Sequence, residues 1–205
     1  MSIHISPEGE VSVKAPHLVP KFIIERFVKE KEEWIKSTLQ KISRRMKKPK
    51  KYVEGEEYLF LGIPRALTFY DGTRIHIDKT KLLFPKALLF RMQKELEQWF
   101  VSQAKEIITK RVAEYSTRMQ ASYNDIFFSD TKSKWGTCTH DNRLQFNWRL
   151  VMTPLMVLDY VVIHELSHTT EKNHGRNFWS KVRQFTPAYR QHRKWLATNA
   201  HLLTL

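Results

Sequence analysis

The alternation of hydrophobic and polar residues near the N-terminus predicts a short β-hairpin. Ile3 and Ile5 alternate with polar residues, as do Val11 and Val13, and a Pro-Glu-Gly sequence lies between the two pairs. Apolar residues at every second position face one side of a strand, while Pro and Gly favour turns. We therefore expect two short strands joined by a turn.

Apolar residues at helical spacing predict helices in three longer parts of the chain. The first helix begins at Pro20 and continues to Ile42, and the second extends from Pro85 to about Gln120. The third begins at Thr153-Pro154, which we expect to act as cap and first helical residue. Two shorter amphipathic helices follow it. We expect the second helix to pack behind the third as structural support.

Short β-prone segments lie between these helices. Those between the first and second helices are Tyr58–Leu61, Ala66–Tyr70, Arg74–Asp78 and Lys81–Phe84. They are separated by turn sequences, and we expect them to form one small sheet together with the N-terminal hairpin. Two more strands, Asp125–Ser129 and Leu144–Leu150, are predicted before the third helix.

Composition and charge indicate a basic globular protein. The chain has 205 residues, of which 41% are hydrophobic, enough to bury a core in one domain or in a domain with a small appendage. Its formal net charge of +14 implies attraction to polyanions such as nucleic acid, phosphorylated substrates or acidic proteins.

Cysteine content and hydropathy favour a cytoplasmic protein. Cys138 is the single cysteine, which excludes an internal disulfide framework and suits a reducing compartment. No apolar run approaches the roughly 20 residues of a membrane span. The first residues lack the basic start and apolar core of a signal peptide. We therefore expect no membrane partner.

The strongest candidate for chemistry lies in the third predicted helix, at His164-Glu165-Leu166-Ser167-His168. Residues four apart share one helix face, so His164 and His168 can bind one metal ion while Glu165 reaches its edge. The alternative is a buried amphipathic helix with packed histidines. Neighbouring aliphatic residues already supply an apolar surface, and two imidazoles with a carboxylate are costly to bury without partners. We therefore predict a zinc site, with Zn²⁺ as the cofactor.

A catalytic zinc site needs a third protein ligand and an open position. No Asp or Glu follows Glu171, which excludes a later acidic ligand and leaves His174, His192, His201 or a residue far upstream. We favour His174, because it follows the second histidine by six residues, the spacing of H-E-x-x-H-x-x-G-x-x-H proteins.

The turn after the second histidine must differ from the turn in that motif, because Glu171 occupies the position of its Gly. Thr169 and Thr170 favour helices only weakly. Asn173 tolerates a left-handed backbone, and we expect it to turn the chain.

This arrangement predicts hydrolysis by a metal-activated water. Three neutral imidazoles leave the metal its full positive charge, which lowers the pKa of a bound water to about 7. Glu165 is placed to take the proton of that water as it attacks a carbonyl, and then to pass it to the leaving amine. The predicted catalytic residue is Glu165, and the predicted metal ligands are His164, His168 and His174.

A family resemblance is carried by several segments around these residues. They are Lys134–Cys138, Leu144–Leu150, Val161–His168, Asn173-His174 and Phe178-Trp179. In them the chain resembles the YgjP-like predicted metal-dependent hydrolases, relatives of the SprT-type zinc metallopeptidases. The resemblance covers most of the chain and is dense from about residue 130 to 196. It implies a zincin-like metallopeptidase domain, with zinc ligands at His164, His168 and His174 and the catalytic acid at Glu165.

The predicted fold class is therefore α+β, a zincin-like metallopeptidase domain with a small N-terminal antiparallel β-rich subdomain. We place the N-terminal β-rich and helical subdomain in residues 1–85 and the zincin-like hydrolase domain in residues 86–205. The expected substrate is a peptide or protein.

Two alternatives follow from the positive charge. The first is a zinc-dependent hydrolase of a phosphate ester or nucleotide, since the tail from Lys172 onward carries many cations and no acidic residue. The second is a nucleic-acid-associated protein with a protease-like fold. For the basic run from Lys41 to Lys51, a solvated surface or linker is preferred over a specific nucleic-acid site, because the run lacks interleaved aromatic residues.

Other side chains have weaker signals. Cys138 is a possible fourth ligand, although a small buried thiol is preferred. Asn147 and Arg149 are candidates for holding substrate, with local hydrogen bonding preferred for both. Tyr189 and His192 are candidates for stabilising a developing oxyanion.

Overall fold

The structure is a computed structural model that describes residues 1–6, 10–45, 50–131 and 134–205. The chain divides into two compact units, Met1–Lys48 and Pro49–Leu205. The second unit contains both the strands before residue 85 and the predicted metal helix. The domain boundary predicted after residue 85 stays a prediction, because compactness reports packing and does not measure separate folding.

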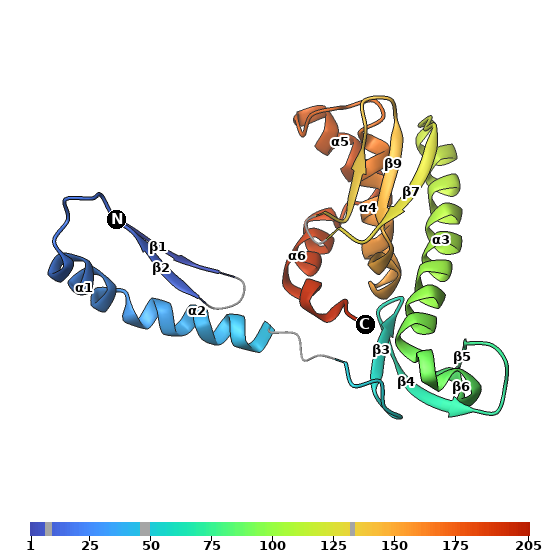
Figure 1. The fold of residues 1–205 in the computed structure, drawn as a ribbon. Coiled ribbons are helices and arrows are strands. Elements are labelled where there is room, and N and C mark those ends of the chain that lie inside the picture. Colours follow the sequence, from blue (N-terminus) through green and yellow to red (C-terminus); the bar gives the residue numbers. More distant parts are fainter. Residues whose placement is uncertain (7–9, 46–49, 132–133) are drawn as a thin grey trace. The chain divides into compact units, whose positions relative to one another are not determined.

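The first unit consists of a hairpin and two helices (Figure 1). Strand β1 (Ser2–Ile5) pairs antiparallel with β2 (Val11–Lys14), as predicted. Helices α1 (Lys21–Glu30) and α2 (Glu32–Arg45) follow. The prediction of one continuous helix is wrong, because α1 ends at Glu30 and the N–H of the cap residue Lys31 donates to the carbonyl of Val28 in a tighter turn.

From Lys41 to Lys48, the side chains of the predicted basic run lie outside the described residues. Its last two members, Lys50 and Lys51, are described. The ammonium of Lys50 lies 4.5 Å from the ring centre of Tyr58, and the backbone N–H of Lys51 donates to the carboxylate of Glu56. Both contacts attach the start of the second unit to its own first sheet.

A four-stranded sheet opens the second unit. Its strands are β3 (Glu57–Phe60), β4 (Ile63–Tyr70), β5 (His76–Asp78) and β6 (Lys81–Pro85). The order is β3-β4-β6-β5, with β4 and β6 parallel and the other two pairs antiparallel. The four strands were predicted, but the prediction that they share a sheet with the N-terminal hairpin is wrong, since β1 and β2 form a separate two-stranded sheet.

A long helix supports the rest of this unit. After the 3₁₀ turn η1 (Lys86–Arg91), helix α3 (Met92–Met119) ends at Gln120, which has a left-handed conformation with φ of 50°. Residues at every fourth position are fully buried: Leu96, Phe100, Ala104, Ile108 and Val112. Residues four apart lie on one helix face, so these residues form a buried face of α3. Helix α3 packs against helix α4 (Leu155–Ser167), and the two lie side by side in Figure 1. The predicted support of the metal helix is confirmed.

Helix α4 is buried on nearly all sides, so it forms the centre of the second unit. Pro154 is its cap residue, and Thr153 donates its hydroxyl to the carbonyl of Leu150 instead of capping the helix as predicted. The four-stranded sheet packs closely against the N-terminal end of α4. A Cβ on Gly62, between β3 and β4, would come within 2.7 Å of Pro154. The N–H of Leu61 also donates to the carbonyl of Val151, at 2.7 Å.

A three-stranded sheet lies beside α4. Its strands are β7 (Asp125–Ser129), β8 (Gly136–Cys138) and β9 (Arg143–Asn147), in the order β7-β9-β8. Strands β7 and β9 are parallel, and β8 is the antiparallel edge strand. The segment after Asn147, predicted as strand, is the 3₁₀ turn η2 (Trp148–Met152), because the side chain of Asn147 accepts a hydrogen bond from the N–H of Arg149.

The chain ends in helices α5 (Arg176–Phe185) and α6 (Tyr189–Asn199) and the short turn η3 (Ala200–Leu202). The predicted α+β fold class is confirmed. Among the described residues, no helix combines the length and the apolar character needed to cross a membrane.

Candidate metal centre

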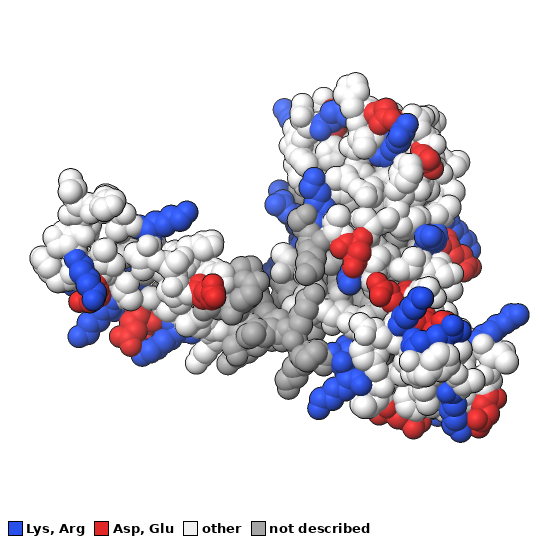
Figure 2. Space-filling view, in the orientation of Figure 1, with Lys and Arg blue, Asp and Glu red and all other residues white. Residues whose placement is uncertain are grey.

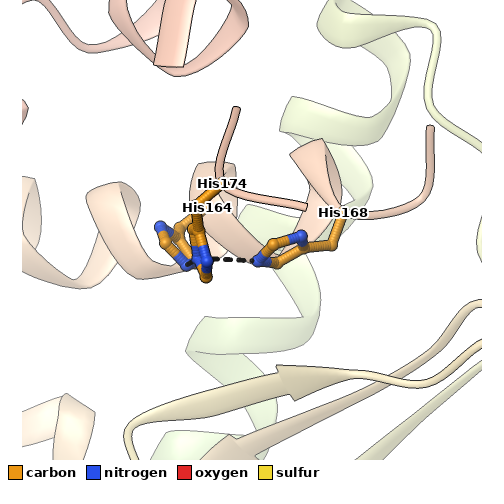
Figure 3. Close-up of side chains that lie close together, drawn as sticks. All are labelled: His164, His168 and His174. Carbon is orange, nitrogen blue, oxygen red and sulfur yellow. Dashed lines mark hydrogen bonds between the residues drawn. The ribbon is translucent and has the colours of Figure 1, made fainter. Parts of the chain in front are cut away.

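The structure brings the three predicted ligands together. His164 and His168 lie one turn apart on α4, and His174 comes from the segment between α4 and α5 (Figure 3). Nε2 of His174 lies 3.1 Å from Nε2 of His164 and 3.1 Å from Nε2 of His168. Their candidate donor atoms all lie within 4.8 Å of one another. Three residues could therefore hold one metal ion.

The chain turns after α4 through short-range hydrogen bonds. The hydroxyl of Thr169 donates to the carbonyl of Leu166 at 2.8 Å, and the hydroxyl of Thr170 donates to that of Ser167. These bonds satisfy carbonyls that a helix end leaves unpaired. The left-handed turn expected at Asn173 is wrong, since this residue is not among the described residues with positive φ.

Hydrogen bonding and burial set the protonation of the histidines. Nδ1 of His168 lies 3.0 Å from the carbonyl oxygen of Glu171, which can only accept, so Nδ1 carries the proton and Nε2 presents its lone pair. Burial, together with the smaller effects of the His168 and His174 charges, lowers the pKa of His164 to about 3. Burial also lowers the pKa of His168. The two helical histidines are thus neutral near pH 7.

Neutral imidazoles in this arrangement fit a metal ion. Each Nε2 that lacks a proton carries a lone pair. A proton on Nε2 of His174 can be donated to Nε2 of either His164 or His168, but not to both at once. A cation placed among the three nitrogens interacts with all of them. Nδ1 of His164 is buried and has no hydrogen-bond partner in the described part of the chain, so Nε2 is the polar atom through which this ring can be held. Imidazole donors suit zinc and other transition metals.

Glu165 lies beside this cluster in a buried position. It is 5% exposed, and burial raises its pKa to about 8, against the opposing effect of the Lys134 charge. A carboxyl group in such surroundings can exchange its proton near neutral pH.

Gly136 of the edge strand makes room for this carboxyl group. A Cβ at position 136 would lie 2.7 Å from Cγ and 2.7 Å from Oε1 of Glu165. The sequence analysis missed this role of Gly136. An isolated Gly within a short strand often marks a close approach of another group, and that signal was available in the sequence.

Aromatic residues of α5 surround the histidine rings. Phe178 stacks on His168, with ring centres 4.4 Å apart, and Trp179 stacks on His174 at 5.7 Å. Phe178 is fully buried. These contacts hold the imidazole planes in place and give Phe178 and Trp179 a definite function in the site.

A pocket of about 360 Å³ opens beside His164 and Glu165. Its apolar lining comes from Trp135, Tyr160, Val161, Leu196 and Ala197. Two exposed cations, Lys134 and Arg193, also line it. The sequence analysis gave Tyr160 no role in the site, and it gave Arg193 a role only as one of the many cations of the tail after Lys172. Tyr160 lies one turn before His164 and was accessible to helical reasoning, whereas Arg193 reaches the pocket only through the packing of α6.

The backbone of β8 has one free edge. The carbonyl of Trp135 accepts from the N–H of Asn147, and the N–H of Thr139 donates to the carbonyl of Arg143. Backbone groups alternate in direction along a strand, so the N–H and C=O groups of Gly136 and Cys138 point away from β9. These groups can pair with an added strand.

Asn147 and Arg149 contact neighbouring residues of the protein, which agrees with the local role preferred for both from the sequence. The amide of Asn147 donates to the carbonyl of Thr131 at 2.8 Å. Arg149 forms an ion pair with Asp130 and lies 4.3 Å from the ring centre of Trp148. Neither side chain lines the pocket beside Glu165.

The remaining candidates lie outside the histidine cluster. Cys138 is half-buried, with its thiol 3.5 Å from the carbonyl oxygen of Thr139, and burial raises its pKa. Tyr189 stacks on Trp179, and its hydroxyl accepts a hydrogen bond from Arg190. The ring of His192 lies 6.2 Å from that of Tyr160. Neither Tyr189 nor His192 lines the pocket.

Comparison with known proteins identifies the family. Residues 1–199 match the family described as YgjP-like, metallopeptidase domain. No curated protein and no solved structure matches the chain. The match includes every residue of the site, agrees with the resemblance noted in the sequence, and supports the zincin-like α+β fold. A metallopeptidase domain implies a metal ion and a peptide substrate, which the histidine cluster and the open strand edge can accommodate. The chain therefore belongs to the YgjP-like metallopeptidase family.

Proposed function

We propose that this protein is a zinc-dependent metallopeptidase with His164, His168 and His174 as zinc ligands and Glu165 as general base. The observation that carries the proposal is the convergence of three imidazole Nε2 atoms beside a buried carboxyl group. A donor set made only of imidazoles favours zinc over magnesium, which prefers oxygen ligands.

Zinc in this centre would supply Lewis-acid chemistry and a nucleophile at neutral pH. Glu165 accepts a proton from the nucleophilic water and later donates it to the nitrogen of the leaving amine. Its burial suits both steps, because the carboxyl group is stable in its protonated form between them.

The edge strand β8 orients the substrate. An extended peptide pairs with the outward N–H and C=O groups of Gly136 and Cys138, as strands do when they add to an open sheet edge. Because Gly136 lies against Glu165, this pairing holds the peptide next to the general base.

The experiment combines metal analysis with peptide cleavage. Purified protein should contain about one zinc per chain. Glu165→Gln should keep the metal and lose roughly 10²- to 10⁴-fold in the rate of peptide hydrolysis. Glu171→Gln is the matched control, since it keeps the backbone carbonyl that holds His168. Undiminished cleavage by Glu165→Gln would show that another group is the base.

Phosphate-ester hydrolysis is the alternative activity, and it is favoured by the two cations in the pocket. The family match favours peptides. Side-by-side assays with a peptide library and nucleoside triphosphates separate the two activities. A nucleic-acid role has less support: on the face shown in Figure 2, Lys and Arg of the second unit are interspersed with acidic and uncharged surface.

A further inference from the structure

The pocket beside the metal centre is cationic at its exposed positions. Lys134 and Arg193 line it, and Glu165, which is buried, is its one carboxyl group among the described residues. Neither cation forms an ion pair with any described residue. The chain also contains no Asp or Glu after residue 171, so α6 itself offers Arg193 no partner.

Arg193 is held close to the reacting groups. Its guanidinium carbon lies 5.9 Å from the ring centre of Trp179, the residue that stacks on His174. Arg193 lines the same pocket as His164 and Glu165. A guanidinium with free N–H donors is suited to bidentate binding of a carboxylate.

The apolar lining suits the carbon chain that would carry such a carboxylate. Tyr160 and Trp135 lie on two walls, from α4 and the start of β8, and Leu196 lies on α6 one turn after His192. A volume of about 360 Å³ accommodates one amino-acid side chain together with its backbone. The pocket thus offers apolar contacts to methylene groups and a positive charge to the carboxylate that they carry.

We propose that this pocket is a substrate subsite for a carboxylate close to the scissile bond, and that Arg193 determines this specificity. The proposal rests on the proposed peptidase function, because it names the class of peptide that the site prefers. A peptide offers the same chemistry from two sources, the side chain of Asp or Glu and the free C-terminus.

The first measurement compares matched peptides. One series replaces Gln by Glu at each position near the cut, and a second compares a free C-terminal carboxylate with a C-terminal amide. The carboxylate should raise kcat/KM by about tenfold, which corresponds to about 1.4 kcal/mol. The pair of peptides whose two members differ in kcat/KM identifies whether the pocket accepts a side-chain carboxylate or the C-terminal carboxylate. Equal rates for both members of every pair would overturn the proposal.

Variants of α6 then test the assignment to Arg193. Arg193→Gln should reduce the ratio of kcat/KM values for Glu and Gln peptides to about one, and Arg193→Lys should restore part of it. Arg193→Glu should prefer Lys over Gln at the same peptide position. Lys194→Gln is the matched control on the same helix, does not line the pocket, and should keep the ratio. A full preference retained by Arg193→Gln would contradict the assignment.

Binding separates this proposal from the proposed activity. Calorimetric titration of Glu and Gln peptides into Glu165→Gln protein, with and without Arg193→Gln, measures recognition without cleavage. Charge-dependent binding with no cleavage of any peptide by the parent protein would support the subsite and reject the peptidase. Cleavage without discrimination would reject the subsite alone. The absence of both binding and cleavage would reject both.

Discussion

Helix α4 contributes to two polar clusters that differ in how completely their groups are satisfied. On one face, both carboxylate oxygens of Asp159 accept hydrogen bonds from Arg111, at 2.6 and 2.5 Å, and the hydroxyl of Tyr115 adds a third at 3.2 Å. Five residues along the helix from Asp159, His164 has a buried nitrogen that no described residue hydrogen-bonds, and burial raises the pKa of its neighbour Glu165 to about 8.

This difference separates polar groups that the protein satisfies by itself from polar groups that can take a ligand. The Asp159 cluster is complete within the protein, and it joins α3 to α4 where charges would otherwise be unpaired. The histidine cluster is incomplete, because its lone pairs converge on one another and Glu165 forms no ion pair with any residue that the structure describes. A buried polar group that the protein leaves unsatisfied indicates that a ligand from outside completes it.

The comparison predicts that zinc stabilises the protein through the histidine cluster, which is the largest effect expected. Zinc at a thousand times its dissociation constant should raise the free energy of unfolding by about 4 kcal/mol. His174→Ala should lose most of this gain while changing the metal-free protein little, because the residue is exposed. Thermal unfolding with and without zinc measures both. His140→Ala, outside the cluster, should behave like the parent. Equal stabilisation of His174→Ala would show that zinc binds elsewhere.

Breaking the complete cluster should destabilise the protein without any metal being involved. Asp159→Ala leaves the guanidinium of Arg111, whose side chain is 20% exposed, without its main partner. We expect a loss of about 3 kcal/mol in the free energy of unfolding, measured by chemical denaturation of the metal-free protein. Asp71→Ala is the control, since its ion pair with Lys86 is exposed and should contribute less than about 1 kcal/mol. Equal losses would contradict the structural role of Asp159.

Gly136→Ala tests how closely the incomplete cluster is packed. The new methyl group would overlap Glu165, so we expect a loss of about 2 kcal/mol in stability and a larger fall in kcat than in zinc affinity. Gly175→Ala is the matched control beside His174, because nothing lies within 4 Å of its Cβ position and its φ of −75° suits Ala. Normal peptide cleavage by Gly136→Ala would mean that Glu165 can move away at little cost.

The smallest effect concerns the hydroxyl of Tyr115 in the complete cluster. Tyr115→Phe removes the hydroxyl that donates to Asp159 and accepts from Arg111 at 3.3 Å, but it leaves both bonds from Arg111 to Asp159. We expect a loss of about 1 kcal/mol in the free energy of unfolding, with zinc affinity unchanged. A loss as large as that of Asp159→Ala would show that the hydroxyl, and not the ion pair, holds the two helices together.

The sequence was informative where the relevant contacts are local. The spacing of His164 and His168 follows from the helical period, and the short segment to His174 limits how far that ring can lie from them. The four-residue spacing along α3 likewise predicted the buried face that supports α4. These features depend on neighbours within about two turns, so the residue pattern carries them.

Some local details were still decided by competing interactions. The first helix is divided at Lys31, and the strand predicted to Leu150 ends at Asn147, whose side chain caps the following turn. The chain after His168 turns through hydroxyl groups without a left-handed residue at Asn173. Hydrophobic spacing does not report such bonds, because each depends on the orientation of one polar group.

The sequence by itself thus determined the three histidines that could hold a metal ion, the α+β class and the helix that supports them. Only the tertiary structure decided that Gly136 faces Glu165, that β8 is an open edge, and that Arg193 lines the pocket. Gly136 and Arg193 are far from Glu165 in sequence, and their positions follow from how a sheet and a helix pack around α4. Such packing depends on the shapes of many side chains together, which no local spacing encodes.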